Sequence, residues 1–145
     1  MKFLLDTMVV SETRKSKPDA NVLSWLASIA RHDQYLSVAT LHEIQRGIAL
    51  TERRNRPFAE ILSRWLDELA HSYVRQVVPV DDGIARRWGS LSGAVGNESV
   101  DLIVAATALE RGLIVATRDI RDFLRAGVTI LNPFEASPAI VSPPP

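Results

Sequence analysis

Short apolar runs alternate with longer amphipathic stretches along this chain. In the segment 21–29, the apolar residues Val22, Trp25, Leu26 and Ile29 recur at the spacing of one face of a helix. Short apolar runs that end in polar or turn-forming residues are typical of buried strands. On this pattern we predict strands near residues 2–5, 35–38, 74–80, 113–117 and 128–131, and helices near 21–29, 40–53, 57–69, 81–91, 99–111 and 119–124.

The alternation of strands and helices indicates the fold class. Strands joined by helical crossovers form a parallel sheet that is covered by helices on both faces. We therefore predict an α/β fold, an α/β/α sandwich with a central parallel sheet of about five strands. The 145 residues suit one domain, which we place at residues 1–135, with 136–145 as a flexible C-terminal tail because the chain ends in SPPP.

Four carboxylates lie where this fold would bring separate segments together. In an open parallel sheet, ligands bind in a crevice along the carboxyl ends of the strands. Asp6 ends the first predicted strand and Asp119 follows the fourth, whereas Glu43 and Asp101 lie near the starts of helices at the same edge. We expect all four to face one crevice. Each residue alone has a simpler explanation, as a helix cap, a first-turn acid or a solvated helical residue.

The expected cluster favours a cation site. Like charges held close together raise one another's pKa values, so an acidic crevice is costly unless a cation neutralises it. A site built only from oxygen ligands points to Mg²⁺ or Mn²⁺ rather than zinc. The chain has no cysteine, and His32, His42 and His71 lack the spacing of a zinc-binding helix.

Composition and charge narrow the function classes only slightly. Seventeen basic and seventeen acidic residues balance, so nothing global indicates nucleic-acid binding, although basic residues gather near 14–17, 53–56 and 86–87. No apolar stretch approaches the roughly 20 residues that span a bilayer. Because Asp6 interrupts the first apolar run, we expect no signal peptide and a cytoplasmic location.

Five segments together resemble a known family. LLDTMVVSE, LSVATLHEIQRGI, VDLIVAATAL, VATRDIRDF and ILNPF occur in the order and approximate spacing of PIN-domain ribonucleases of the VapC toxin type, over nearly the whole chain. The resemblance implies a PIN-like fold and a metal-dependent endoribonuclease that uses Mg²⁺ (or Mn²⁺). It also implies a type II toxin–antitoxin system, a cognate VapB-like antitoxin, an RNA substrate, and a homodimer within a toxin–antitoxin hetero-oligomer.

The resemblance also assigns roles to the four carboxylates. Asp6, Glu43 and Asp101 match the acids that the family places around the metal. Asp119 matches a fourth position, which is Asp or Asn in the family, so it binds through water or tunes the site. We predict all four as catalytic and metal-binding residues, and we interpret Asp122 as structural.

Supporting residues follow from the same match, with one departure. Thr7 and Thr117 fall where the family places hydroxyl groups that orient carboxylates or metal-bound water, and Arg118 is a candidate phosphate contact or else a surface ion-pair partner. Met8 stands where the family usually has Asn. A thioether has little hydrogen-bonding capacity, so Met8 lowers activity, shifts the geometry of the site, or is harmless.

Two other functions remain as alternatives. Met8 is the only support for a non-catalytic or weakly active PIN-like module that binds RNA or a protein partner. A nucleotide-binding or receiver-like domain is disfavoured, because no glycine-rich phosphate loop follows the first strand. The pair Asp81 and Asp82 is explained more simply as the start of a helix.

Overall fold

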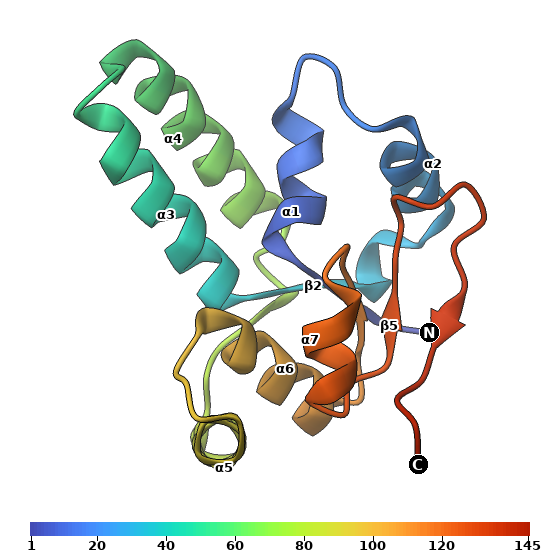
Figure 1. Ribbon diagram of the computed structural model, residues 1–145. Coiled ribbons are helices and arrows are strands. Elements are labelled where there is room, and N and C mark those ends of the chain that lie inside the picture. The colour runs from blue at the N-terminus through green and yellow to red at the C-terminus, as the bar shows by residue number, and fades with distance from the viewer.

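A central sheet of six strands, in the order β3-β2-β1-β4-β5-β6, organises the fold (Figure 1). The computed structural model describes residues 1–145. The first five strands run parallel and β6 is antiparallel to β5, so the predicted α/β class with a mainly parallel sheet is confirmed. The strands are β1 (Phe3–Leu5), β2 (Gln34–Ser37), β3 (Val77–Val78), β4 (Ile114–Ala116), β5 (Ile130–Leu131) and β6 (Ile140–Val141).

Seven α-helices and two short 3-10 helices connect the strands. They are α1 (Thr7–Val10), η1 (Ser11–Arg14), α2 (Ala20–Ser28), η2 (Arg31–Asp33), α3 (Val38–Glu52), α4 (Arg56–Ser72), α5 (Asp82–Val95), α6 (Val100–Arg111) and α7 (Ile120–Arg125). The predicted helices are all present, most with boundaries shifted by a few residues. Helix α1 was not predicted because a single turn shows no periodicity, and the strand predicted at 74–80 is shorter, at Val77–Val78.

Alternate residues of β1 face two separate apolar layers. Phe3 and Leu5 point into a core shared with α2, α3 and α4, whereas Leu4 points into a second core shared with α6 and α7. Successive side chains of a strand project to opposite faces of its sheet, so all three residues are buried. β1 is thus the central strand of a sheet covered on both faces, and its carboxyl end is held from both sides.

The strand order reverses next to β1. The chain leaves β1 for β2 and β3 on one side and returns as β4 on the other side. Ligand sites of parallel α/β sheets lie in the crevice at such a reversal, beyond the carboxyl ends of the strands. The backbone N–H of Asp6 donates to the carbonyl oxygen of Ala116 at 3.0 Å, so the chain just past β1 stays joined to β4 where this crevice begins.

Side chains that cap α3 and α5 mark where the chain leaves a strand and begins a helix. The Ser37 hydroxyl accepts a hydrogen bond from the N–H of Ala39 at 3.0 Å, so β2 passes into α3 without a loop. Asp81 caps α5 by accepting from the N–H of Ile84 at 2.9 Å, which confirms that the Asp81–Asp82 pair begins a helix. The direct passage from β2 to α3 places Glu43 in the second turn beyond the strand.

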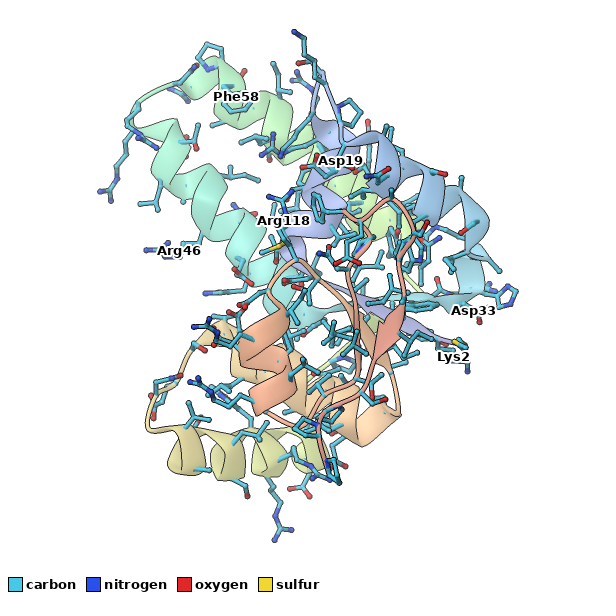
Figure 2. The ribbon with its side chains drawn as sticks, turned by 45° about the vertical axis from the view of Figure 1, so that its right-hand side comes forward. Lys2, Asp19, Asp33, Arg46, Phe58 and Arg118 are labelled. Atoms are coloured by element: carbon cyan, nitrogen blue, oxygen red, sulfur yellow. The ribbon has the colours of Figure 1, made fainter.

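Helices α3 and α4 form a hairpin that extends from one side of the sheet (Figure 1). Leu62, Leu66 and Leu69 of α4 are buried in the first core, whereas Phe58 and Ile61 are exposed. Figure 2 shows Phe58 near the tip of the hairpin. Core packing is therefore the main role of the apolar residues of α4. None of the helices combines the length and the apolar character that crossing a bilayer requires.

The C-terminal segment adds a strand that the sequence did not predict. Ile140 and Val141 form β6 and pair antiparallel with Leu131 and Ile130 of β5. Both β6 residues are exposed, so backbone pairing rather than side-chain burial holds them. This explains why a search for apolar patterns passes over the strand. The division between a domain at 1–135 and a flexible tail stays a prediction.

Candidate metal centre

Three carboxylates meet at the carboxyl edge of the sheet. Asp6 follows β1, Glu43 lies in the second turn of α3, and Asp101 lies in the first turn of α6. One carboxylate oxygen of each lies within 4.8 Å of those of the other two. The topology thus gathers residues that are far apart in the sequence, as expected from the positions of strand and helix ends.

Asp6 is the buried centre of this group, with 4% of its surface exposed. Its Oδ1 accepts a hydrogen bond from the backbone N–H of Thr7 at 2.8 Å, and its Oδ2 accepts one from the Thr117 hydroxyl at 2.8 Å. The first bond makes Asp6 the N-cap of α1. The cap and the cluster are therefore not competing explanations, because one carboxylate takes part in both.

Thr7 joins Asp6 to Glu43. Its backbone N–H binds Asp6, and its hydroxyl donates to Oε1 of Glu43 at 3.1 Å. Asp101 is half-buried and accepts no hydrogen bond from another residue of the protein. Two of the three carboxylates are thus oriented by threonine hydroxyls, and the oxygens of the third are free to bind a ligand.

The pKa of each of these carboxyl groups is raised above its ordinary value. Burial is the largest cause for Asp6, Glu43 and Asp101. Neighbouring negative charges add to the effect, since Glu43 acts on Asp6, Asp101 on Glu43, and Asp6 on Asp101. The hydrogen bonds from Thr117 and Thr7 lower the pKa of Asp6 and only partly offset its burial. The charged form of the cluster is therefore costly by itself.

Asp119 lies beside the three carboxylates but outside their group. Its negative charge raises the pKa of both Asp6 and Asp101. Its backbone N–H donates to the Thr117 hydroxyl at 2.9 Å, so that this hydroxyl accepts from Asp119 and donates to Asp6. Asp122, in α7, is exposed, and its charge also raises the pKa of Asp101.

The donor set fits a hard divalent cation. No lysine or arginine forms an ion pair with Asp6, Glu43 or Asp101, so no ion pair within the chain neutralises their charge. Two oxygens bound to one Mg²⁺ at about 2.1 Å lie at most about 4.2 Å apart. Small side-chain rotations would bring oxygens now within 4.8 Å to that spacing. Carboxylate oxygens alone favour Mg²⁺ or Mn²⁺ over zinc.

The carboxylates open onto a groove on one side and a cavity on the other. Glu43 and Thr7 line a groove between α1, α3 and α4 that also holds Arg14. Asp101 lines a cavity formed with residues of α7 and of the segment before α6, including Arg125. Each of the two hollows is thus lined by a carboxylate of the group and by an arginine.

Sequence reasoning missed two residues that surround the predicted residue Arg118. The guanidinium of Arg118 lies 3.6 Å from the centre of the Phe134 ring. Its positive charge also acts on buried Glu12, whose pKa is lowered first by the hydrogen bond from Lys15. Phe134 and Glu12 belong to the segments ILNPF and LLDTMVVSE. Their place in these family-like segments was the available signal, but their contacts cannot be read from the sequence.

The departure at Met8 lies at the surface of α1. Met8 is 39% exposed, so its side chain does not fill the interior of the carboxylate group. His42, next to Glu43, is also exposed, and its charge acts to lower the pKa of Glu43. Neither residue displaces a carboxylate from the group.

The PIN-domain family model matches residues 3–128, which include the whole carboxylate group. The chain belongs to the PIN-domain family. The resemblance inferred from the five sequence segments is thereby confirmed. Among the relatives of this chain, the toxin FitB of Neisseria gonorrhoeae is 33% identical over 90% of this chain and 97% of its own length. The VapC ribonuclease Y4jK of Sinorhizobium fredii is 35% identical over 91% of this chain and 97% of its own length.

Two solved structures are similar to this chain over most of its length. FitAcB from Neisseria gonorrhoeae superimposes with a TM-score of 0.79 at 33% identity, over 91% of this chain and 98% of that chain. VapBC-5 from Mycobacterium tuberculosis, a member of the VapBC family of toxin–antitoxin systems, superimposes with a TM-score of 0.55 at 26% identity, over 82% of this chain and 86% of that chain. The PIN fold therefore extends over most of the chain.

The raised pKa values predict that the metal-free site destabilises the protein at neutral pH. A carboxyl group with a raised folded-state pKa contributes stability below its unfolded pKa, about 3.9 for Asp, and loses that contribution as the pH rises through the folded value. In EDTA at pH 7 we therefore expect Asp101→Asn to melt at a higher temperature than the wild type. The difference should shrink as the pH falls toward 4 in a thermal-shift series.

A first-turn acid outside the carboxylate group is the matched control. Asp82, in the first turn of α5, is exposed and lies outside the cluster. Asp82→Asn should slightly lower the melting temperature, because it removes a favourable charge at a helix N-terminus, worth about 0.3–1 kcal/mol. An Asp101→Asn protein that melts below the wild type at pH 7 would contradict the destabilisation that we attribute to the burial of the Asp101 carboxylate and its repulsion by neighbouring acids.

The hydrogen bond from Thr117 predicts an indirect effect on metal affinity. Thr117→Val keeps the shape of the side chain but removes the donor to Asp6 Oδ2. Mutation of residues that orient metal ligands typically lowers metal affinity roughly 10- to 100-fold. We therefore expect a loss of Mn²⁺ affinity of that order, measured by calorimetry. Thr107→Val removes an equally buried hydroxyl, which donates to Ile103 within α6, and should leave Mn²⁺ affinity unchanged. Equal losses in both variants would show a general packing effect.

Proposed function

We propose that this chain is a metal-dependent endoribonuclease that acts as the toxin of a type II toxin–antitoxin system. The carrying observation is the group of three carboxylates, which has no cationic partner within the chain. Membership of the PIN-domain family supports the nuclease assignment. Relatives named as a toxin and as a VapC ribonuclease, each similar over at least 90% of the chain, support toxicity and RNA as the substrate.

Asp6, Glu43 and Asp101 would hold one or two Mg²⁺ or Mn²⁺ ions, with Asp119 acting through water or through its charge. A bound divalent cation would supply charge neutralisation for the scissile phosphate and a more acidic water to attack it. Burial favours cation binding further, because it weakens the competition from bulk water for the carboxylate charges.

The threonines and a carboxylate would perform the remaining steps. Thr117 and Thr7 fix the oxygens of Asp6 and Glu43 before a ligand arrives, so less reorganisation accompanies binding. One carboxylate of the group would accept the proton of the attacking water. Hydrolysis would leave a 5′ phosphate.

Local basic residues would place the RNA backbone at the site. The net charge is zero, so attraction to phosphate must come from arginines near the carboxylates. Arg14 lines the groove on the Glu43 side, Arg125 lines the cavity on the Asp101 side, and Arg118 lies on the loop after β4. A single-stranded or looped RNA suits this arrangement, because its backbone can bend across a narrow site.

A VapB-like antitoxin is the partner that would neutralise the toxin. The similarity to VapBC-5, whose family is described as toxin–antitoxin systems, supports a hetero-oligomer with such a protein. A homodimer of the chain is also part of the proposal. The exposed Phe58 and Ile61 of α4 offer apolar surface for one of these contacts.

Cleavage of RNA by the antitoxin-free protein tests the function. With Mg²⁺ or Mn²⁺, the purified chain should cut cellular RNA, and EDTA should abolish cutting. Asp6→Asn should lower the rate of cleavage by more than about 100-fold, since mutation of residues that only orient metal ligands already lowers activity roughly 10- to 100-fold. Asp82→Asn, which removes an acid far from the group, should cut like the wild type.

The same experiment separates the proposal from its alternative. Equal cutting by wild type and a folded Asp6→Asn would show that the carboxylates are not the active site. A wild type that binds Mn²⁺ but cuts no RNA would support the non-catalytic module instead. If Met8→Asn then cut RNA, the thioether at position 8 would be the cause of the inactivity of the wild type.

A further inference from the structure

Arg118 is exposed, lies between Thr117 and Asp119 in the sequence, and forms no ion pair with Asp6, Glu43 or Asp101. Thr117, which precedes it, donates to Asp6, and the charge of Asp119, which follows it, acts on Asp6 and Asp101. The arginine side chains that pair or hydrogen-bond within the protein belong to Arg31, Arg56, Arg87 and Arg111. The side-chain N–H donors of Arg118 therefore bind no other residue of the protein.

The Phe134 ring accounts for this position. The Arg118 guanidinium lies 3.6 Å from the ring centre, a distance typical of a close stacked cation–π contact. Stacking engages the flat face of a guanidinium and leaves its edge donors free. In Figure 2, Arg118 is labelled beside α1 and the adjoining loops.

The ring itself is fixed by two asparagine side chains. The backbone N–H of Phe134 donates to Oδ1 of Asn132 at 3.1 Å, and the carbonyl oxygen of Phe134 accepts from Nδ2 of Asn21 at 2.9 Å. Phe134 also packs against the first core. This gives the segment ILNPF a physical task, because Asn132 shapes the turn and Phe134 presents its ring to Arg118.

The acid Glu12 is near Arg118 but forms no ion pair with it. Glu12 is buried and already pairs with Lys15, and it accepts a hydrogen bond from the N–H of Asp19 at 2.9 Å. Arg118 lowers the pKa of Glu12 only as the smallest of several causes. The side chain of Arg118 is thus positioned by an uncharged ring, and no ion pair within the protein neutralises its positive charge, which is available to a ligand.

We propose that Arg118 binds a backbone phosphate of the RNA beside the carboxylate group, and that Phe134 is the residue that positions its guanidinium there. The proposal rests on the proposed function, because it concerns the substrate of that site. A planar fork of free donors matches the oxygens of a phosphate diester. Stacking on the Phe134 ring leaves the edge donors of Arg118 available to the phosphate, while the carboxylates have no ion-pair partner and stay available to a metal ion.

RNA binding without cleavage tests the proposal. A fluorescein-labelled single-stranded RNA would be titrated in EDTA at several salt concentrations and followed by fluorescence anisotropy. The variants are Arg118→Gln, Arg118→Lys, Phe134→Leu and Phe134→Tyr. Arg86→Gln is the matched charge control, since exposed Arg86 lies near the end of α5 that contacts Glu110, at the other end of α6 from Asp101.

We expect Arg118→Gln to weaken binding about tenfold at low salt and to lower the slope of log affinity against log salt by about 0.7, the value for one phosphate contact on a single strand. Arg118→Lys should keep the slope and lose part of the affinity. Phe134→Leu, which keeps the apolar volume, should weaken binding with little change in slope. Phe134→Tyr, which keeps the ring, should bind like the wild type.

Three results would overturn the proposal: no RNA binding by the wild type, the same affinity and slope for Arg118→Gln and Arg86→Gln, or equal affinities for Phe134→Leu and Phe134→Tyr. Melting temperatures of all variants would show whether a loss reflects unfolding. Because the titration contains no metal, its outcome is independent of cleavage. Binding that depends on Arg118 without any metal-dependent cutting would refute the nuclease function and leave the phosphate contact standing.

Discussion

The burial of one carboxylate at the centre of the sheet is the constraint on which the site depends. Asp6 lies where β1 ends between β2 and β4, and only 4% of its surface is exposed. A buried carboxylate is tolerated only when its oxygens are hydrogen-bonded or its charge is neutralised. Thr7 and Thr117 supply the hydrogen bonds, and they do so from the first turn of α1 and from the end of β4. The same bonds that stabilise Asp6 therefore fix the edges of the crevice.

The packing of the sheet maintains an arrangement that electrostatics opposes. Burial and mutual repulsion raise the pKa values of Asp6, Glu43 and Asp101, so these groups alone would favour separation or protonation. The two apolar layers hold β1, α3 and α6 in place against this tendency. No lysine or arginine forms an ion pair with the three carboxylates that would relieve it. The fold thus holds the three carboxylates in an arrangement that favours the binding of a cation.

Topology made much of the site predictable, whereas contacts between distant segments were not. Asp6, Glu43 and Asp101 could be assigned to one edge because parallel strands end at the same edge of a sheet. Asp119 was placed correctly beside them, but only the structure shows that it lies outside the group of three. The ring of Phe134 meets Arg118 because the chain returns after β5, and no local pattern encodes that return. Helix α1 was missed because a single turn shows no period, and strand β6 because its exposed residues are held by backbone pairing rather than by burial.

Proton release on Mn²⁺ binding tests most directly whether the fold holds these carboxylates ready for a cation. Calorimetric titrations in buffers of different ionisation enthalpy would measure it at several pH values. The raised pKa values of Asp6, Glu43 and Asp101 predict release at mildly acidic pH that diminishes as the pH approaches 8. Absence of Mn²⁺ binding, or binding that releases no protons at any of these pH values, would contradict the account.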